Sequence, residues 1–366
     1  MSKGGKFSTY EGILFMTIII FSKILYTSPA VVVKQVGTAC WYSTLISCAA
    51  AIISFLLVCV LLGRFPGKSL EKVFEAVLGK VLGKVCGLLF SLYILFYAAS
   101  SLREFLDVIK VYNLPDTPPS VIMITFIAVS MLIAYKGIES IVRASCISFY
   151  FIIFGLIIIL LMAAPYYNFD YIKPYFGYGL KKSLYVGLLR SSAYEEVLTL
   201  AIVITSLHSV NDCKKIGVTS LILTGIIFSI CFICYLATFQ YTMGSENLSG
   251  MFQLSRTIYY SRYVQRIESI FLFIWVIASL LTTSTAFYLS IRVYCQSFDI
   301  KDHRPLLLPF ALLMYVTALQ PKNVSELINI NLLFIRQYSY YPNFGIPILV
   351  LIVSLILRKK EGGGNA

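Results

Sequence analysis

Three ionisable side chains stand in stretches that are otherwise apolar. Lys23 lies near the centre of an apolar run from Gly12 to Val33. Glu195 and Glu196 interrupt a later run. A charge at the middle of a membrane span costs about 2.5 kcal/mol or more, so it normally faces a partner or a polar cavity. We predict an ion pair between Lys23 and one of these two glutamates, against the alternative that Lys23 extends to the membrane interface.

The backbone around these charges is predicted to be broken. Pro29 has no N–H and clashes with the carbonyl of Leu25, so the first helix should kink or unwind between Lys23 and Pro29. The later run, 183–207, is interrupted at its centre by Arg190 and by the residues that follow it up to Glu196. Paired broken helices mark the binding site in many secondary transporters.

A binding site for a small amphoteric ligand is therefore predicted at these breaks. Unwound backbone offers N–H and C=O groups to an ammonium and a carboxylate, and hydroxyl groups at similar depth complete the site. For Tyr97 and for the hydroxyl groups of Thr282 and Ser284, ordinary hydrogen bonds between helices are the alternative. The predicted ligand-binding residues are Lys23, Ile24, Tyr26, Thr27, Ser28, Tyr97, Ser191, Ser192, Tyr194, Glu195, Thr282 and Ser284, with Lys23, Glu195 and Glu196 as the ion-pair or coupling group.

Composition defines the class of protein that must position these residues. Of 366 residues, 58% are hydrophobic and 13% are charged, whereas soluble domains average about 25% charged residues. The chain is predicted to be an all-α polytopic membrane protein. Its formal charge of +13 is spread over short clusters at span ends, which suits an anionic lipid surface and not a nucleic acid.

Ten spans are predicted, and the first is expected to remain in the mature protein. They form a single membrane domain, 1–366, in which a first repeat of about 9–163 is followed by an inverted second repeat of about 183–358, with short cytoplasmic termini. The segment 69–84 is predicted to be an amphipathic surface helix that buries Leu70, Val73, Phe74, Val77 and Val81, and 321–337 to be a surface segment. The approximate spans are 12–33, 41–62, 85–108, 120–135, 141–163, 183–207, 218–239, 267–294, 305–319 and 344–357.

Three stretches resemble the spore germination permease family, the B subunits of nutrient germinant receptors in endospore-forming bacteria. They are LREFLDVIKVYNLPDTPP from Leu102, the region Tyr194 to Glu196, and RIESIFLFIW from Arg266. The family is similar to the amino acid, polyamine and organocation transporters. That resemblance implies a five-plus-five fold with a pocket between spans one, three, six and eight. Members commonly have a Gly-rich break in span one, whereas this chain has FSKILYTSP, in which Lys23 could occupy the place of a coupling Na⁺.

The resemblance implies a receptor subunit of the spore inner membrane that acts with an A-type membrane subunit and a C-type lipoprotein subunit. Its ligand would be a small germinant, expected to be an amino acid, whose binding triggers germination. The alternative is a free-standing amino acid or amine transporter, possibly proton coupled through Lys23 or the glutamates.

No enzyme, cofactor or metal site is expected. Cys231 and Cys234 have metal-like spacing, but they lie in an apolar stretch without a second ligand pair. His208 and His303 are isolated in polar loops, and no nucleophile and base are recognisably arranged.

Overall fold

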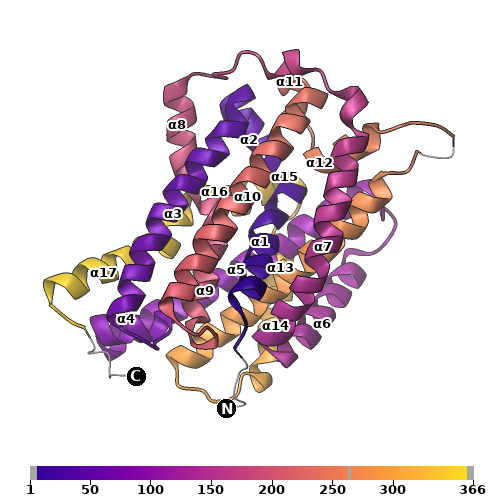
Figure 1. Ribbon diagram of the computed structural model, residues 1–366. Coiled ribbons are helices and arrows are strands. Elements are labelled where there is room, and N and C mark those ends of the chain that lie inside the picture. The colour runs from indigo at the N-terminus through magenta and orange to yellow at the C-terminus, as the bar shows by residue number, and fades with distance from the viewer. Residues whose placement is uncertain (1–5, 263–264, 361–366) are drawn as a thin grey trace.

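The computed structural model describes residues 6–262 and 265–360, which form a bundle of helices (Figure 1). No strand occurs among these residues. The long helices are α3 (Cys40–Arg64), α5 (Lys80–Tyr112), α6 (Pro119–Lys136), α7 (Ile138–Met162), α10 (Val210–Thr238) and α13 (Glu268–Ser297). The shorter helices are α1 (Thr9–Phe21), α2 (Ser28–Val36), α4 (Leu70–Leu78), α8 (Leu180–Leu189), α9 (Thr199–Ile202), α11 (Tyr241–Gly244), α12 (Gly250–Thr257), α14 (Leu307–Leu319), α15 (Val324–Glu326), α16 (Leu333–Tyr338) and α17 (Ile346–Ile356).

The protein is a multi-pass membrane protein. In the described part of the chain, 7 helical stretches are long and apolar enough to cross a bilayer, judged by length and composition. That criterion omits interrupted segments, such as α1 with its following turn, and α14, which has 13 residues. The predicted count of ten spans therefore stays a prediction, while the all-helical membrane fold is confirmed.

The first predicted helix break is confirmed. Ser8 caps α1 by accepting a hydrogen bond from the backbone N–H of Glu11, and the helix continues to Phe21. A tight 3-10 turn, Ser22–Leu25, follows, and α2 then begins at Ser28 with Pro29 in its first turn. Because proline has no N–H to donate, it suits the start of a new helix and not the interior of the old one.

The second predicted break is also confirmed. Helix α8 ends at Leu189, and a 3-10 segment, Arg190–Leu198, leads into the short α9. Most of this segment is buried, including the charged side chains of Arg190, Glu195 and Glu196. Buried polar groups and charges need partners, so this segment must find them inside the bundle.

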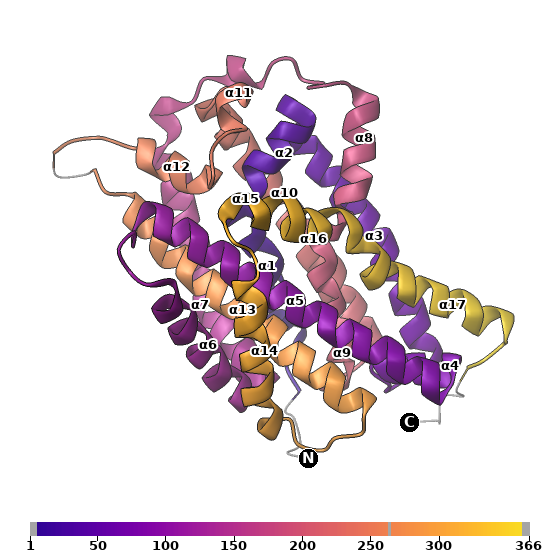
Figure 2. The same cartoon turned by 180° about the vertical axis from the view of Figure 1, so that it is seen from behind.

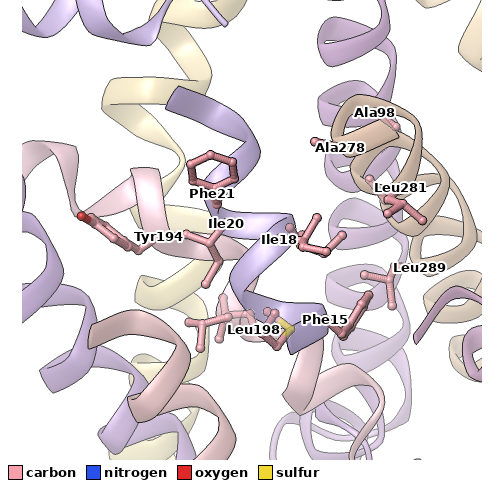
Figure 3. Packing of buried hydrophobic residues seen from close by; sticks show 14 of the residues in the cluster. Phe15, Ile18, Ile20, Phe21, Ala98, Tyr194, Leu198, Ala278, Leu281 and Leu289 are labelled. Atoms are coloured by element: carbon pink, nitrogen blue, oxygen red, sulfur yellow. The ribbon is translucent and has the colours of Figure 1, made fainter. Parts of the chain in front are cut away.

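Helix α13 forms much of the core that surrounds the breaks. It packs against α5, α6 and α7 and carries the fully buried Trp275 and Phe287. Figure 3 shows Phe15 and Ile18 of α1 facing Leu281 and Leu289 of α13, while Tyr194 and Leu198 lie on the other side of α1. The first span is thus packed between the second broken segment and α13.

The predicted amphipathic helix over 69–84 was wrong at its C-terminal end. Leu70, Val73, Phe74 and Val77 are buried as expected, but α4 ends at Leu78. Gly79 has a φ of 88°, a conformation that glycine adopts without strain, and α5 begins at the next residue. Val81 therefore belongs to α5, where it is 76% exposed.

The predicted surface segment 321–337 was also wrong. A helical run, Val324–Ile356, continues from α15 through α16 to α17, and Figure 2 shows it as one bent element on this face of the molecule. Its bends coincide with two wide helical turns, Leu327–Leu332 and Tyr341–Gly345. The segment buries Leu332 and Ile335, and it brings Arg336 to the two helix breaks.

Candidate functional site

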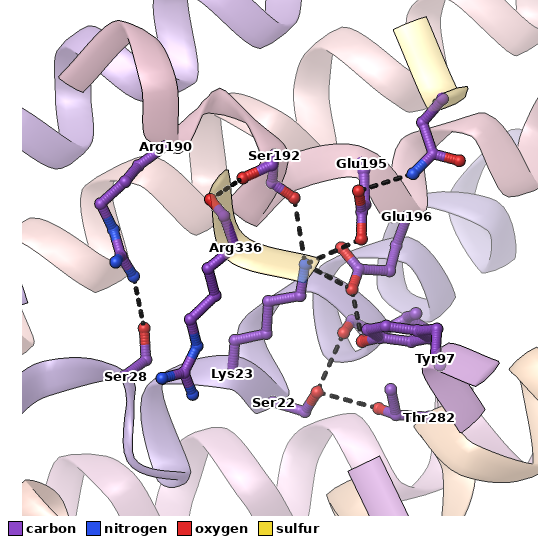
Figure 4. A network of polar contacts seen from close by, with 12 residues as sticks. Ser22, Lys23, Ser28, Tyr97, Arg190, Ser192, Glu195, Glu196, Thr282 and Arg336 are labelled. Atoms are coloured by element: carbon purple, nitrogen blue, oxygen red, sulfur yellow. Dashed lines mark hydrogen bonds and ion pairs between the residues drawn. The ribbon is translucent and has the colours of Figure 1, made fainter. Parts of the chain in front are cut away.

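Lys23 meets the predicted carboxylates where the two broken helices come together. Its Nζ lies 2.7 Å from Glu196 Oε1 and 4.0 Å from Glu195 Oε1. It also donates a hydrogen bond to the carbonyl oxygen of Ser192, 3.3 Å away, and lies 5.6 Å from the centre of the Tyr97 ring. Figure 4 shows the ammonium group between the unwound backbone and the two carboxylates. The short contact makes Glu196 the principal ion-pair partner.

The two glutamates are held by neutral donors as well. Tyr97 Oη donates to Glu196 Oε1 at 2.6 Å, and Tyr93 Oη donates to Glu195 Oε1 at 3.1 Å. Asn343, in the second wide turn of the last helical run, donates to Glu195 Oε2 at 2.6 Å. Glu196 Oε2 is buried and has no hydrogen-bond partner among the described residues. An acceptor of that kind is free for a ligand donor or a bound water.

A cavity that we call the inner cavity lies directly beside the glutamates. It has an empty volume of about 450 Å³, and both aromatic and hydroxyl side chains line it. Its lining includes Tyr93, Tyr97, Glu195, Glu196, Thr282 and Thr285.

A second buried ion pair joins the first break to the last helical run. Arg336 Nη2 lies 2.9 Å from Glu104 Oε1 and 2.7 Å from Thr27 Oγ1. The same Glu104 oxygen accepts hydrogen bonds from Thr27, from its backbone N–H at 3.0 Å and from its Oγ1 at 2.5 Å. A charged acceptor for an orphan backbone N–H stabilises an interrupted helix, so Glu104 helps to fix the break before α2.

Two further cavities lie on the Arg336 side of Lys23. The middle cavity is lined by residues that include Lys23, Tyr26, Ser28 and Ser192, and the outer cavity by residues that include Thr27, Lys34 and Gln35. Their empty volumes are about 540 Å³ and about 950 Å³. Arg190 and Arg336 line both. The two arginines therefore form a shared wall between the cavities.

Several predicted site residues line the cavities. Tyr26, Ser28 and Ser192 line the middle cavity, Thr27 lines the outer one, and Ile24 lines a smaller cavity next to Ser28. Thr282 lines the inner and middle cavities, and its Oγ1 donates to Ser22 Oγ at 3.0 Å. Their role in binding a ligand stays a prediction.

Three predicted site residues face elsewhere. Ser284 donates to Ser130 of α6 at 3.1 Å, and the next residue, Thr285, lines the inner cavity in its place. Tyr194 points to α3, where its Oη and Thr44 Oγ1 are 2.8 Å apart. Ser191 donates to the carbonyl of Leu188, near the end of α8. The direction in which each of these side chains points was not predicted correctly.

Other residues of the site were not predicted as part of it. Tyr93, Glu104, Arg190, Arg336 and Asn343 supply the contacts described above. For Glu104 and Arg190 a signal was present, since a charge inside an apolar span is a candidate functional residue. Arg336 and Asn343 carried no such signal, because the segment before the tenth predicted span is polar along much of its length.

Among the described residues no group of three or more histidine, cysteine or acidic side chains is arranged to hold a metal ion. The positive charge at the centre of the site is supplied by Lys23. A fixed ammonium group between two carboxylates has the electrostatic effect that a bound monovalent cation would have there.

The fold is that of coupled transporters. The chain is similar to a Na⁺-coupled sialic acid symporter solved in a substrate-bound outward-open state, with a TM-score of 0.69 and 12% identity over 98% of this chain and 91% of that one. It is also similar to a nucleobase-cation-symport-1 family transporter in a closed conformation with bound bromovinylhydantoin, with a TM-score of 0.60 and 14% identity over 97% and 92% of the two chains. At these identities the comparison defines the fold alone.

The sequence comparisons then define the family. The family described as "Spore germination protein" matches residues 6–327, so the chain belongs to the spore germination permease family. It is 22% identical to spore germination protein KB of Bacillus subtilis (strain 168), over 95% of both chains. It is also 22% identical to the putative spore germination protein YfkT of the same organism, over 80% of both chains. The resemblance stated from three sequence stretches is thereby confirmed.

Proposed function

We propose that this chain is the B-type, ligand-binding subunit of a nutrient germinant receptor in the spore inner membrane. Membership of the spore germination permease family supports the role in germination. The observation that carries the ligand-binding role is the Lys23–Glu196 ion pair, which lies where two broken helices meet and beside the inner cavity. In transporter folds, such breaks near mid-membrane bind the substrate.

The proposed ligand is a small amino acid-like molecule. Its ammonium group would compete with Lys23 for Glu196, whose second oxygen is buried without a partner in the described chain. Hydroxyl groups of Tyr97 and Thr282 lie at the same cavity. A ligand that binds one arrangement of these groups better than another shifts the protein between conformations by that difference in affinity, and this shift is the signal.

The receptor role implies partner subunits and a defined orientation. We place an A-type membrane subunit and a C-type lipoprotein subunit beside this chain, with both of its termini in the cytoplasm. The described part of the chain begins and ends at the same end of the bundle, which supports an even number of crossings (Figure 1). The proposal assigns no catalytic step to the chain, and both its family and its structural neighbours are permeases or transporters.

A free-standing amino acid or amine transporter is the second candidate. The similarity to cation-coupled transporters favours it, and the arrangement of Lys23 with two carboxylates is one that can exchange a proton. Binding and uptake must be measured separately to distinguish the two functions.

The first experiment uses spores of the organism that encodes this chain. Deletion of the gene should abolish germination in response to at least one nutrient, followed as the fall in optical density of a spore suspension. The wild-type gene should restore the response. Normal germination of the deletion strain with every nutrient that triggers the wild type would refute the receptor role.

The second experiment uses the purified full chain in proteoliposomes with radiolabelled amino acids. We expect saturable binding without uptake for the wild type and loss of binding for Lys23→Ala. Lys110→Ala is the control, because Lys110 Nζ donates to the Thr117 carbonyl at the far end of α5. Concentrative uptake that Lys23→Ala abolishes would make the chain a coupled transporter and overturn the receptor proposal.

A further inference from the structure

Two guanidinium groups, one buried and one mostly buried, lie where the outer and middle cavities share a wall. Arg190 comes from the second broken helix and Arg336 from α16. Each of these two side chains lines the outer cavity and the middle cavity. Figure 4 shows the two side chains on the same side of the network, away from Glu195 and Glu196. A ligand in either cavity can therefore contact them.

Among the described residues, Arg190 has hydrogen-bond partners but no carboxylate partner. Its side chain is buried, with 5% exposed. Nη1 donates to Gln35 Oε1 at 3.3 Å and Nη2 to Ser28 Oγ at 3.2 Å, and both acceptors are neutral. No described carboxylate lies within 4 Å of it, whereas a buried charge is normally paired.

Arg336 is only partly satisfied. Its Nη2 is used by Glu104 and Thr27, but Nη1 is buried and has no partner among the described residues. One carboxylate, Glu104, thus serves one of the two guanidinium groups. Both arginines therefore have N–H groups that the described contacts do not use. Guanidinium groups favour planar carboxylates as acceptors.

The outer cavity carries the charge that would bring an anion to this position. Its charged lining residues are Lys34, Arg190, Arg336 and Glu246, three cations against one anion. A cleft lined mainly by one sign of charge raises the local concentration of ligands of the opposite sign.

We propose that Arg190 and Arg336 together bind the carboxylate group of the ligand where the outer and middle cavities share a wall. This inference rests on the proposed ligand-binding function and adds the position and chemistry of one ligand group. The carboxylate supplies the missing counter-charge of Arg190 and accepts from the free Nη1 of Arg336. The rest of the ligand then extends towards Lys23 and the inner cavity.

The test measures binding to the purified full chain in lipid nanodiscs. The panel contains the twenty L-amino acids, sodium propionate, the carboxamide analogue of each acid that binds, and uncharged sugars and nucleosides. All are titrated at constant ionic strength while the melting temperature is followed by tryptophan fluorescence. We expect a saturable rise with at least one carboxylate and none with its carboxamide.

The variants assign that effect to the two arginines. Arg190→Gln and Arg336→Gln should each weaken carboxylate binding at least about tenfold, equivalent to about 1.4 kcal/mol. Arg190→Lys should recover part of the loss. Arg64→Gln should bind like the wild type, because Arg64 donates to the carbonyls of Ser354 and Lys359 far from the cavities.

The outcomes separate this inference from the proposed function. A carboxamide that binds the wild type as tightly as its acid overturns the inference, and this comparison needs no variant to fold. Unchanged affinity in both Arg190→Gln and Arg336→Gln does the same. Binding of a neutral compound alone overturns the inference and leaves the proposed function standing, whereas saturable binding of nothing in the panel contradicts both.

Discussion

Separating Lys23 from Glu196 should cost more stability than any surface ion pair of the molecule contributes. The side chains are 18% and 6% exposed, and the ammonium group lies 2.7 Å from the carboxylate oxygen. Lys23→Met keeps most of the side-chain volume but leaves Glu196 with Tyr97 as its remaining donor. Removing one partner of a buried pair typically costs 3–5 kcal/mol. We expect about 3 kcal/mol for Lys23→Met, because the lysine is not fully buried.

The assay is a double-mutant cycle of Lys23→Met and Glu196→Gln. Equilibrium unfolding in mixed micelles with increasing SDS, followed by tryptophan fluorescence, gives the free energy of unfolding of each variant. The double variant has neither charge, so it should be less destabilised than the sum of the single variants by about 2 kcal/mol or more. Lys72→Met is the control. Its ion-pair partners are more exposed, Glu75 at 23% and Asp299 at 60%, and solvent-exposed pairs contribute about 0–1 kcal/mol.

Additive losses in this cycle would refute the reasoning. Additivity within about 0.5 kcal/mol would mean that Lys23 and Glu196 do not interact energetically, whatever their distance. A loss for Lys23→Met no larger than that for Lys72→Met would contradict the claim that burial strengthens the pair. Reversal of both charges offers a second check, since it should restore part of what each single reversal loses.

Three further predictions concern packing, pH and the inner cavity. Gly83→Ala should destabilise the protein by about 1–3 kcal/mol, because the added Cβ would lie 2.4 Å from the backbone of α4. Gly63→Ala is the control and should be neutral or stabilising, since nothing lies within 4 Å of its added Cβ. Equal unfolding midpoints for the two variants would contradict this prediction. Burial raises the pKa of Glu71 from its ordinary 4.5 to about 7. The folded state therefore binds more protons than the unfolded state between these values, and stability should fall as pH rises through this window by about 3 kcal/mol. Glu71→Gln should remove that dependence, and an unchanged pH profile of the unfolding midpoint would count against it. Thr285→Phe should fill the inner cavity and abolish the binding of any ligand found by titration. Ser284→Ala is the control and should bind the ligand normally, because Ser284 bonds to α6. The reverse pattern would support the prediction from sequence that Ser284 binds the ligand.

The breaks and the central charges of this protein could be predicted from the sequence for an energetic reason. A lysine and two glutamates in apolar spans are too costly to leave unpaired, so their presence already requires a polar interior. Pro29 indicates where a new helix starts, because a residue without an N–H fits the first turn of a helix and not its interior. Both constraints can be read from the order of residues alone, and they were sufficient to predict that Lys23 pairs with Glu195 or Glu196.

The orientation of individual side chains could not be predicted in the same way. Ser284 and Thr285 are adjacent in sequence, but successive residues of an α-helix point about 100° apart, so one bonds to α6 and the other lines the cavity. Residues 281–291 of α13 are all buried, so hydrophobicity does not distinguish one face of the helix from another there. Tyr194 was misplaced for a related reason, because a 3-10 segment has a different period from an α-helix.

Arg336 was missed because its helix does not have the composition of a typical span. The polar residues between 321 and 343 dilute the hydropathy of a helical run that is nevertheless packed into the bundle. Their polarity has a structural cause, since Arg336 and Asn343 supply partners for Glu104 and Glu195. The buried glutamates thus explain why the helical run that contains Arg336 and Asn343 has a low hydropathy. This relation can be recognised only once the structure shows which residues are in contact.

The wide turns on either side of α16 affect how the chain tolerates a change in length. A wide turn is a helical turn that holds one surplus residue, while the helix on each side keeps its angular phase. Removing one residue from Leu327–Leu332 would convert the turn to an ordinary one and leave Arg336 facing Glu104. The same deletion in the regular α5, ahead of Glu104, would rotate that carboxylate by about 100° about the helix axis. A change of one residue in length is thus compatible with the Arg336–Glu104 ion pair in the turn before Arg336, but not in the helix before Glu104.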